Sequence, residues 1–175
     1  MYKVELLVKL KIPDVTALTA ANTLRRRLGY ADILERLERA DYYLFEVEAE
    51  SEEQACAIVR EIAERTTLFV NPNKHSFQLH PWAERQEIPR TNDAYEVRCL
   101  VRELDYDAAP DILRQLSHTQ WGEKIKGLQT GTLWILHLRA PSPEAAKKVA
   151  EEIAVTRSRG RGLLVNPHYQ SCVVF

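Results

Sequence analysis

The sequence predicts an α+β fold of two tandem βαββαβ units, each a four-stranded antiparallel sheet with two helices on one face, pairing as a pseudo-dimer. Two observations predict this fold. Short strings recur in the same order in both halves, most clearly LFVNP at Leu68–Pro72 and LLVNP at Leu163–Pro167. Period-two and helical hydrophobic patterns also follow one another in the same order in each half.

The repeated strings set the domain boundaries. The proline-bounded segment between the repeats is typical of a stiff, non-helical connector. Trp82 in this connector is expected to dock on one of the repeats. The predicted organisation is a first repeat, a linker and a second repeat at residues 1–79, 80–94 and 95–175.

Each repeat begins with a strand and a helix. Residues 2–10 alternate apolar and polar side chains, as a half-buried strand does, and residues 95–102 repeat that alternation. A helix follows in the first repeat and is expected to stop at Gly29. Its counterpart begins near Pro110, a good first helical residue. The expected buried stripe of the first helix is Leu18, Ala21, Leu24 and Leu28.

A hairpin is expected next. In the first repeat, Ile33–Leu37 and Tyr42–Ala49 are predicted as strands, joined by a turn at Glu38–Asp41. In the second repeat the turn is predicted at Thr130–Thr132, followed by a strand at Leu133–Ala140.

The second helix of each repeat has the clearest start. Ser51 and Gln54 form a capping box, and Ser142 is the corresponding cap, followed by Pro143. The last strands are predicted at His75–Leu79 and Tyr169–Phe175, with a loop inserted around Ser158–Arg161 in the second repeat.

The strand faces turned away from the helices are not fully polar. A sheet face open to water would not need apolar side chains at its centre, so this face is expected to be covered by the other repeat or by a second copy of the chain. The predicted interface residues are Leu7, Leu44, Leu100, Leu133 and Ile135.

Charge and hydropathy exclude several classes of protein. The net charge is −1, with 24 basic and 25 acidic side chains, so the basic excess of a nucleic-acid binder is missing. No apolar run approaches the roughly 20 residues of a membrane span, and the alternating N-terminus is unlike a secretory signal. We therefore expect a cytoplasmic protein, in which Cys56, Cys99 and Cys172 are free, buried thiols.

No motif predicts chemistry. The five histidines show no metal-ligand spacing, and nucleophile and zinc motifs are missing from the sequence. The glycine cluster at Gly160–Gly162 lies between a helix and a strand, the reverse of a phosphate loop. Anion binding by Arg157, Arg159 and Arg161 stays open. We expect no catalytic, cofactor-binding or metal-binding residues.

The order of these elements resembles the PurS family, the small subunit of phosphoribosylformylglycinamidine synthase. The resemblance rests on the first strand, a helix ending in LGY at Leu28–Tyr30, the hairpin, the second helix and the LL-x-NP ending. It covers both repeats. The chain therefore resembles a tandem duplication, similar to the N-terminal domain of the large single-chain enzyme.

The resemblance implies a non-catalytic adaptor of a ligase complex of purine biosynthesis. In the family this subunit self-associates and bridges the synthetase (PurL-like) and glutaminase (PurQ-like) subunits. Two segments depart from the family. Pro13–Thr16 only weakly matches its DPQG-like segment, and Leu37–Asp41 does not match its VR-x-GK hairpin. Contacts made there are expected to be altered.

Two other functions remain open. Paired βαββαβ repeats also form regulatory modules that bind small ligands, and this is the alternative reading. An independent enzyme is the third, disfavoured because no acid–base pair or nucleophile stands out in the sequence.

Overall fold

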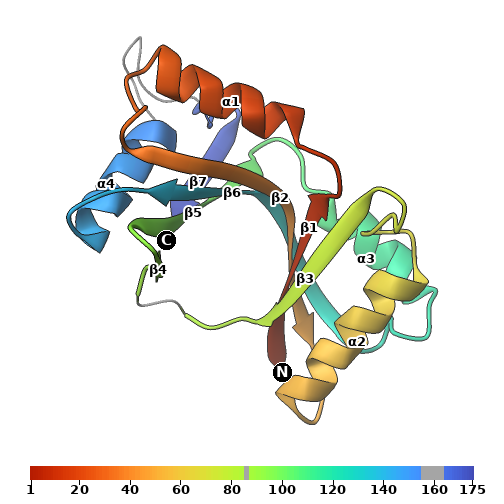
Figure 1. Cartoon of the computed structure of the whole chain (residues 1–175). Helices are drawn as coiled ribbons and strands as arrows, with labels where there is room; N and C mark the ends of the chain where they lie inside the picture. Colours follow the sequence, from red (N-terminus) through yellow and green to blue (C-terminus); the bar gives the residue numbers. More distant parts are fainter. Residues whose placement is uncertain (85–86, 155–163) are drawn as a thin grey trace. The chain divides into compact units, whose positions relative to one another are not determined.

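The computed structural model describes residues 1–84, 87–154 and 164–175 (Figure 1). The predicted α+β class with an antiparallel sheet is confirmed. The inserted loop at Ser158–Arg161, with Arg157 and Gly160–Gly162, lies outside the described residues. The elements are, in order, β1 (Tyr2–Leu10), α1 (Val15–Arg26), β2 (Leu34–Val47), α2 (Glu52–Arg65), β3 (His75–Pro81), β4 (Arg90–Thr91), β5 (Ala94–Glu103), α3 (Ala109–Ser117), β6 (Ile125–Leu138), α4 (Pro143–Ala154) and β7 (Gln170–Val174).

The chain forms two compact units that each combine both halves of the sequence. Unit 1 comprises Met1–Ile12, Ala40–Glu84 and Tyr106–Gly131, and unit 2 comprises Pro13–Arg39, Arg85–Asp105 and Thr132–Phe175. Unit 1 therefore contains α2 with α3, and unit 2 contains α1 with α4. The compact units do not coincide with the consecutive repeats, which remain a prediction about the sequence.

The predicted hairpins are wrong, because β2 and β6 are each one continuous strand of 14 residues. The segment at Glu38–Asp41 has no Gly or Asn for a tight turn, and its Ala40 is buried within the strand. β2 changes from unit 2 to unit 1 after Arg39, and β6 changes from unit 1 to unit 2 after Gly131. The gap in the apolar pattern thus marks where each strand leaves one core and enters the other.

Each unit contains part of a seven-stranded antiparallel sheet. In unit 1, β1 lies between β2 and β3, and β6 follows β2. In unit 2, β5 lies between β6 on one side and β7 with β4 on the other. The Glu48 N–H donates to the Lys124 carbonyl at 2.8 Å in unit 1, and the Arg139 N–H donates to the Ile33 carbonyl at 2.8 Å in unit 2. The end of each strand therefore lies beside the start of the other, which makes β2 and β6 antiparallel.

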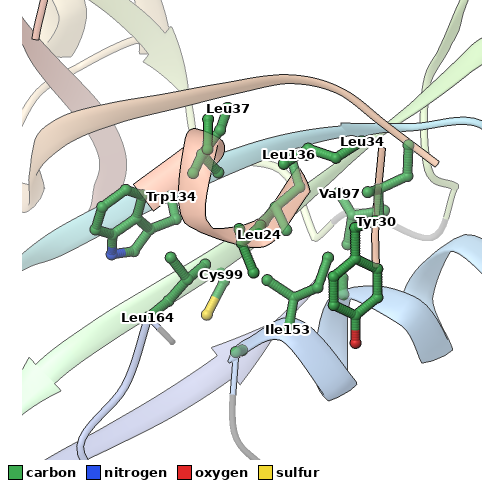
Figure 2. Close-up of a cluster of buried hydrophobic side chains, with 14 of the residues drawn as sticks. Leu24, Tyr30, Leu34, Leu37, Val97, Cys99, Trp134, Leu136, Ile153 and Leu164 are labelled. Atoms are coloured by element: carbon green, nitrogen blue, oxygen red, sulfur yellow. The ribbon is translucent and has the colours of Figure 1, made fainter. Parts of the chain in front are cut away.

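Two hydrophobic clusters coincide with the two units. In unit 1, Phe45 of the sheet packs with Ile62 of α2 and Leu116 of α3. In unit 2, Leu24 of α1 and Ile153 of α4 belong to one cluster with the strand residues of β5 and β6 (Figure 2). Each sheet therefore buries one face against two helices, one from each half of the chain.

Side-chain caps fix the helix starts. The Asp14 carboxylate accepts from the N–H groups of Thr16 and Ala17 at 3.0 and 3.2 Å, which starts α1 at Val15. The buried stripe is consequently Ala17, Ala21 and Leu24, and the expected burial of Leu18 is wrong, since it is 53% exposed. The predicted cap of α2 is confirmed: the Gln54 N–H donates to Ser51 Oγ at 3.1 Å.

The start of the connector docks on unit 1, as predicted for Trp82. Its N–H donates to the Lys3 carbonyl at 2.9 Å, and Lys3 Nζ lies 5.1 Å from the centre of its ring. This contact continues the edge of β3 beside β1. Among the described residues, no helix is both long and apolar enough to cross a membrane.

Candidate partner-binding surfaces

The five predicted interface residues are all buried within the single chain. Each lies on the sheet face turned away from the helices of its unit, called here the helix-free face, and neither hydrophobic cluster contains them. The chain's own atoms cover them, so no second protein is needed to remove them from water. Their exposed fractions are 1% for Leu7, 5% for Leu44, 5% for Leu100, 0% for Leu133 and 4% for Ile135.

Polar groups accompany these residues on the helix-free face of unit 1. The Tyr42 hydroxyl donates to Glu5 Oε1 at 2.9 Å, and both side chains are buried. Lys3 and Glu46, opposite each other in the register of β1 and β2, form an ion pair at 3.7 Å. The buried carboxylate of Glu5 is therefore stabilised by a hydrogen bond within its own unit.

The helix-free face of unit 2 carries a charged cluster that the sequence analysis did not single out. His137 Nε2 lies 2.9 Å from Glu38 Oε2 and 3.2 Å from an Arg36 nitrogen. Arg98 Nε donates to Glu96 Oε1 at 3.1 Å, and Glu96 is opposite His137 in the register. The signal that could have found it is strand alternation, which puts His137 on the same face as Leu133 and Ile135.

The outer side of α2 in unit 1 is hollowed by two cavities. One, of about 470 Å³, is lined by Glu52, Glu53, Cys56, Ala57, Arg60, Glu61, Glu64 and Pro81. The other, of about 400 Å³, is lined by Gln54, Ala57, Ile58, Glu61, Gln120, Trp121 and Lys124. Ala57 and Glu61 line both, and we call the combined lining the α2 surface.

Glu61 is held in place at the middle of this surface. Trp121 Nε1 donates to Glu61 Oε2 at 3.1 Å, so the segment between α3 and β6 fixes the carboxylate on α2. Glu52, Glu53 and Glu64 extend the acidic character along the helix. The α2 surface is therefore a mainly acidic surface with a small residue, Ala57, between its two hollows.

The thiol on the α2 surface is not poised for catalysis. Burial, followed by the charge of Glu52, raises the pKa of Cys56, so the thiol stays protonated near neutral pH. Elsewhere in unit 1, the hydrogen bond from Lys126, at 2.8 Å, lowers the pKa of Glu48. Burial and then the charge of Asp41 raise the pKa of Tyr43 to about 12.

The corresponding helix of unit 2 has a different outer side. When α2 and α4 are aligned on their caps, Ser51 and Ser142, the exposed lysines Lys147 and Lys148 stand where α2 has Cys56 and Ala57. The α2 surface is mainly acidic, whereas α4 mixes these lysines with acidic residues.

The described residues contain no group of three or more His, Cys, Asp or Glu side chains placed to hold a metal ion. The charged cluster around His137 consists of groups that already contact one another, and no nucleophilic side chain takes part in these contacts. The arrangement is suited to satisfying buried charge within a sheet.

Comparison with protein families gives one match. Residues 2–81 match the PurS family, described as phosphoribosylformylglycinamidine (FGAM) synthase. The match runs from β1 to the end of β3 and connects the chain with FGAM synthase and purine biosynthesis. Searches of curated proteins and of solved structures gave no match.

Proposed function

Because residues 2–81 belong to the PurS family, we propose that this chain is a non-catalytic adaptor subunit of the FGAM synthase complex in de novo purine biosynthesis. It bridges the synthetase subunit and the glutaminase subunit. The family match is the observation that carries the proposal. The second half of the chain has the same βαβαβ order of elements, which supports a tandem duplication of the family unit.

The unequal outer helices support a bridging role. A symmetric homodimer presents the same surface twice, whereas two diverged units present two different surfaces. The α2 surface is mainly acidic and has two hollows beside Ala57, and the α4 side carries Lys147 and Lys148. We assign one partner subunit to the α2 surface, where a basic side chain inserted beside Glu61 would find a complementary charge.

Self-association, if it occurs, uses surfaces other than the five predicted interface residues. Those residues are already covered in the single chain. Exposing them to a second copy would require the chain to open. Cytoplasmic location stays a prediction.

Co-elution with the purified synthetase and glutaminase subunits on size-exclusion chromatography tests the proposal. We expect a complex that contains all three chains, and we expect deletion of the gene to produce a purine requirement. A chain that binds neither subunit, and whose loss leaves purine synthesis intact, contradicts the adaptor role.

A substitution on α2 tests the docking surface separately. Ala57→Arg places a large charged side chain between the two hollows without disturbing the core, because Ala57 is exposed, and we expect it to weaken binding of one partner about tenfold or more. Gln115→Arg is the matched control, since it introduces the same side chain at an exposed position of α3 in the same unit. Equal binding by both variants would exclude the α2 surface while leaving the adaptor role intact.

The second candidate is a regulatory module that binds a small ligand. The observation that favours it is the size of the two cavities, which fall within the range of small-molecule sites. A screen of amino acids and nucleotides by thermal shift separates the two functions, because a ligand that binds only the folded state raises the melting temperature.

A further inference from the structure

Two of the three cysteines meet in unit 2. Cys99 on β5 and Cys172 on β7 have their Sγ atoms 2.7 Å apart, compared with about 2.05 Å in a disulfide bond. In the register of the two strands, Cys99 is opposite Val174 and Val101 is opposite Cys172. The two cysteines are thus diagonal neighbours on one face of the sheet, and their side chains point at each other.

The two thiols differ in accessibility. Cys99 is fully buried, and Figure 2 shows its sulphur among the side chains of the unit 2 cluster. Cys172 is only half-buried, on a five-residue strand close to the C-terminus. An oxidant from solution therefore reaches Cys172 first, and Cys99 lies directly behind it.

The electrostatic environment gives the two thiols different roles. The hydrogen bond between the two sulphurs lowers the pKa of Cys172, and this effect outweighs burial and the charge of Glu151 on α4, which both raise it. The same hydrogen bond and burial raise the pKa of Cys99. Cys172 is thus the more accessible and more readily ionised of the two thiols, and Cys99 lies in contact with it, an arrangement typical of an attacking and a resolving cysteine.

We propose that Cys99 and Cys172 form a reversible disulfide in response to hydroperoxides, making the β5–β7 edge of unit 2 a redox-sensitive site. The Cys172 thiolate attacks one oxygen of hydrogen peroxide, the O–O bond breaks, and hydroxide departs. Cys172 then carries a sulfenic acid. The Cys99 sulphur then attacks the sulfenic sulphur, the S–O bond breaks, and the departing hydroxide takes the Cys99 proton as water. The two thiols lose two electrons and two protons in total, and one peroxide becomes two waters.

The disulfide would secure β7 against β5. In the part of the chain that the structure describes, β7 pairs only with β5. Its pairing is extended by reciprocal backbone hydrogen bonds between Arg98 and Phe175, at 2.7 and 2.8 Å. A covalent bond from Cys172 to Cys99 keeps this short strand attached to β5. Oxidation therefore changes the stability of unit 2 and leaves unit 1 without a new constraint.

The experiment exposes the purified, reduced full-length chain to a small molar excess of hydrogen peroxide. Remaining thiols are then alkylated, and the chain is digested without reductant for peptide mass spectrometry. We expect one cross-linked peptide pair that joins Cys99 and Cys172, with two hydrogens lost, reversed by dithiothreitol. Cys56 is the internal control, because its raised pKa and separate location predict that it stays alkylatable.

A thermal measurement tests the consequence. We expect the melting temperature of the oxidised chain to exceed that of the reduced chain by about 5–10 °C. Cys172→Ser should abolish this difference; the substitution is suitable because the side chain is half-buried on an edge strand.

Two results would overturn the proposal. One is oxidation of Cys172 to its sulfinic or sulfonic acid while Cys99 stays reduced, which shows that Cys99 does not resolve the sulfenic acid. The other is a cross-link that forms only in denaturant, which shows that the folded chain does not hold the sulphurs in reach. Neither result depends on whether the chain binds FGAM synthase subunits.

Discussion

Units 1 and 2 share a plan of sheet and helices but differ in their buried polar residues. The registers of β1 with β2 and of β5 with β6 start equivalently, with Tyr2 opposite Val47 and Tyr95 opposite Leu138. Counted from these pairs, Glu5 of unit 1 corresponds to Arg98 of unit 2, and Glu46 corresponds to His137. The sign of the charge is thus reversed at the first position, and an imidazole replaces a carboxylate at the second.

The difference shows which constraints a duplicated fold keeps. Both units retain a cluster of apolar side chains between sheet and helices, because that burial stabilises any sequence with this pattern. The polar positions have changed together with their local partners: Glu5 with Tyr42, and Arg98 with Glu96. The buried polar residues and the partners named here differ between the two units, so the units are no longer interchangeable.

The largest loss of stability is expected from a substitution that tests which helices complete the core of each unit. Leu24→Ala removes a fully buried side chain of α1. This helix lies in the first half of the sequence, between β1 and α2 of unit 1, but its buried face belongs to the core of unit 2. We expect a loss of about 2–5 kcal/mol of stability. Hydrogen exchange measured by mass spectrometry should show lost protection in β5 and α4 before β1 and α2.

The reciprocal substitution is Leu116→Ala, on α3 from the second half of the chain. It should lower protection from hydrogen exchange first in β1 and α2, with a similar loss of stability. Leu18→Ala is the control on α1, because Leu18 is exposed and should change stability by less than about 0.5 kcal/mol. Protection lost in the opposite units would contradict the division described here.

An intermediate effect is expected at the buried hydrogen bond found in unit 1. Tyr42→Phe leaves the buried Glu5 carboxylate with one donor fewer, which should cost about 1–3 kcal/mol in urea unfolding. The equivalent position in unit 2 is Leu133, where no hydroxyl is needed. Tyr2→Phe serves as the control, because its hydroxyl makes a long, exposed bond of 3.3 Å to the Glu50 carbonyl. Equal stability of the two variants would show that the Glu5 contact contributes nothing.

The smallest effect is a pH dependence specific to unit 1. Tyr43 has a pKa raised from 10.0 to about 12, whereas the equivalent residue of unit 2 is Trp134, which does not titrate. The folded state favours the neutral phenol, so this contribution to stability is fully present below pH 10 and is lost as the pH rises towards 12.

Urea midpoints measured across this pH range check the effect. Tyr43→Phe keeps the edge-on packing against Phe69, where the ring centres lie 4.8 Å apart, but cannot ionise. Wild type should therefore lose more stability than Tyr43→Phe between pH 10 and 12. Parallel curves would show that Tyr43 is not responsible.

Much of the fold follows from local patterns in the sequence. The cap at Ser51 and the alternation from Tyr2 to Leu10 specify α2 and β1, because hydrogen bonding and burial there involve near neighbours. The family match over residues 2–81 confirms the resemblance for the first repeat, and the resemblance of the second repeat stays a prediction.

The exchange of helices between the units could not be predicted in this way. A stripe such as Ala17, Ala21 and Leu24 says that a face is buried but does not say against which sheet. The charged run at Glu38–Asp41 resembles a turn in the sequence. It is the short stretch of β2 that lies between the residues of one hydrophobic cluster and those of the other. The Cys99–Cys172 contact was missed for a related reason: it depends on the register of two strands that are distant in sequence.

The exchange also sets the order in which the protein can mature on the ribosome. Unit 1 is incomplete until Gly131 has been synthesised, and α1 waits for the later segments of unit 2, which include β5, β6 and α4. Domains usually fold as units during synthesis, the N-terminal one first. Here neither unit can do so, because each contains segments from both halves of the chain, and the apolar face of α1 stays without its final partners until α4 has been synthesised. Neither core can therefore be completed while only the first half of the chain has been made.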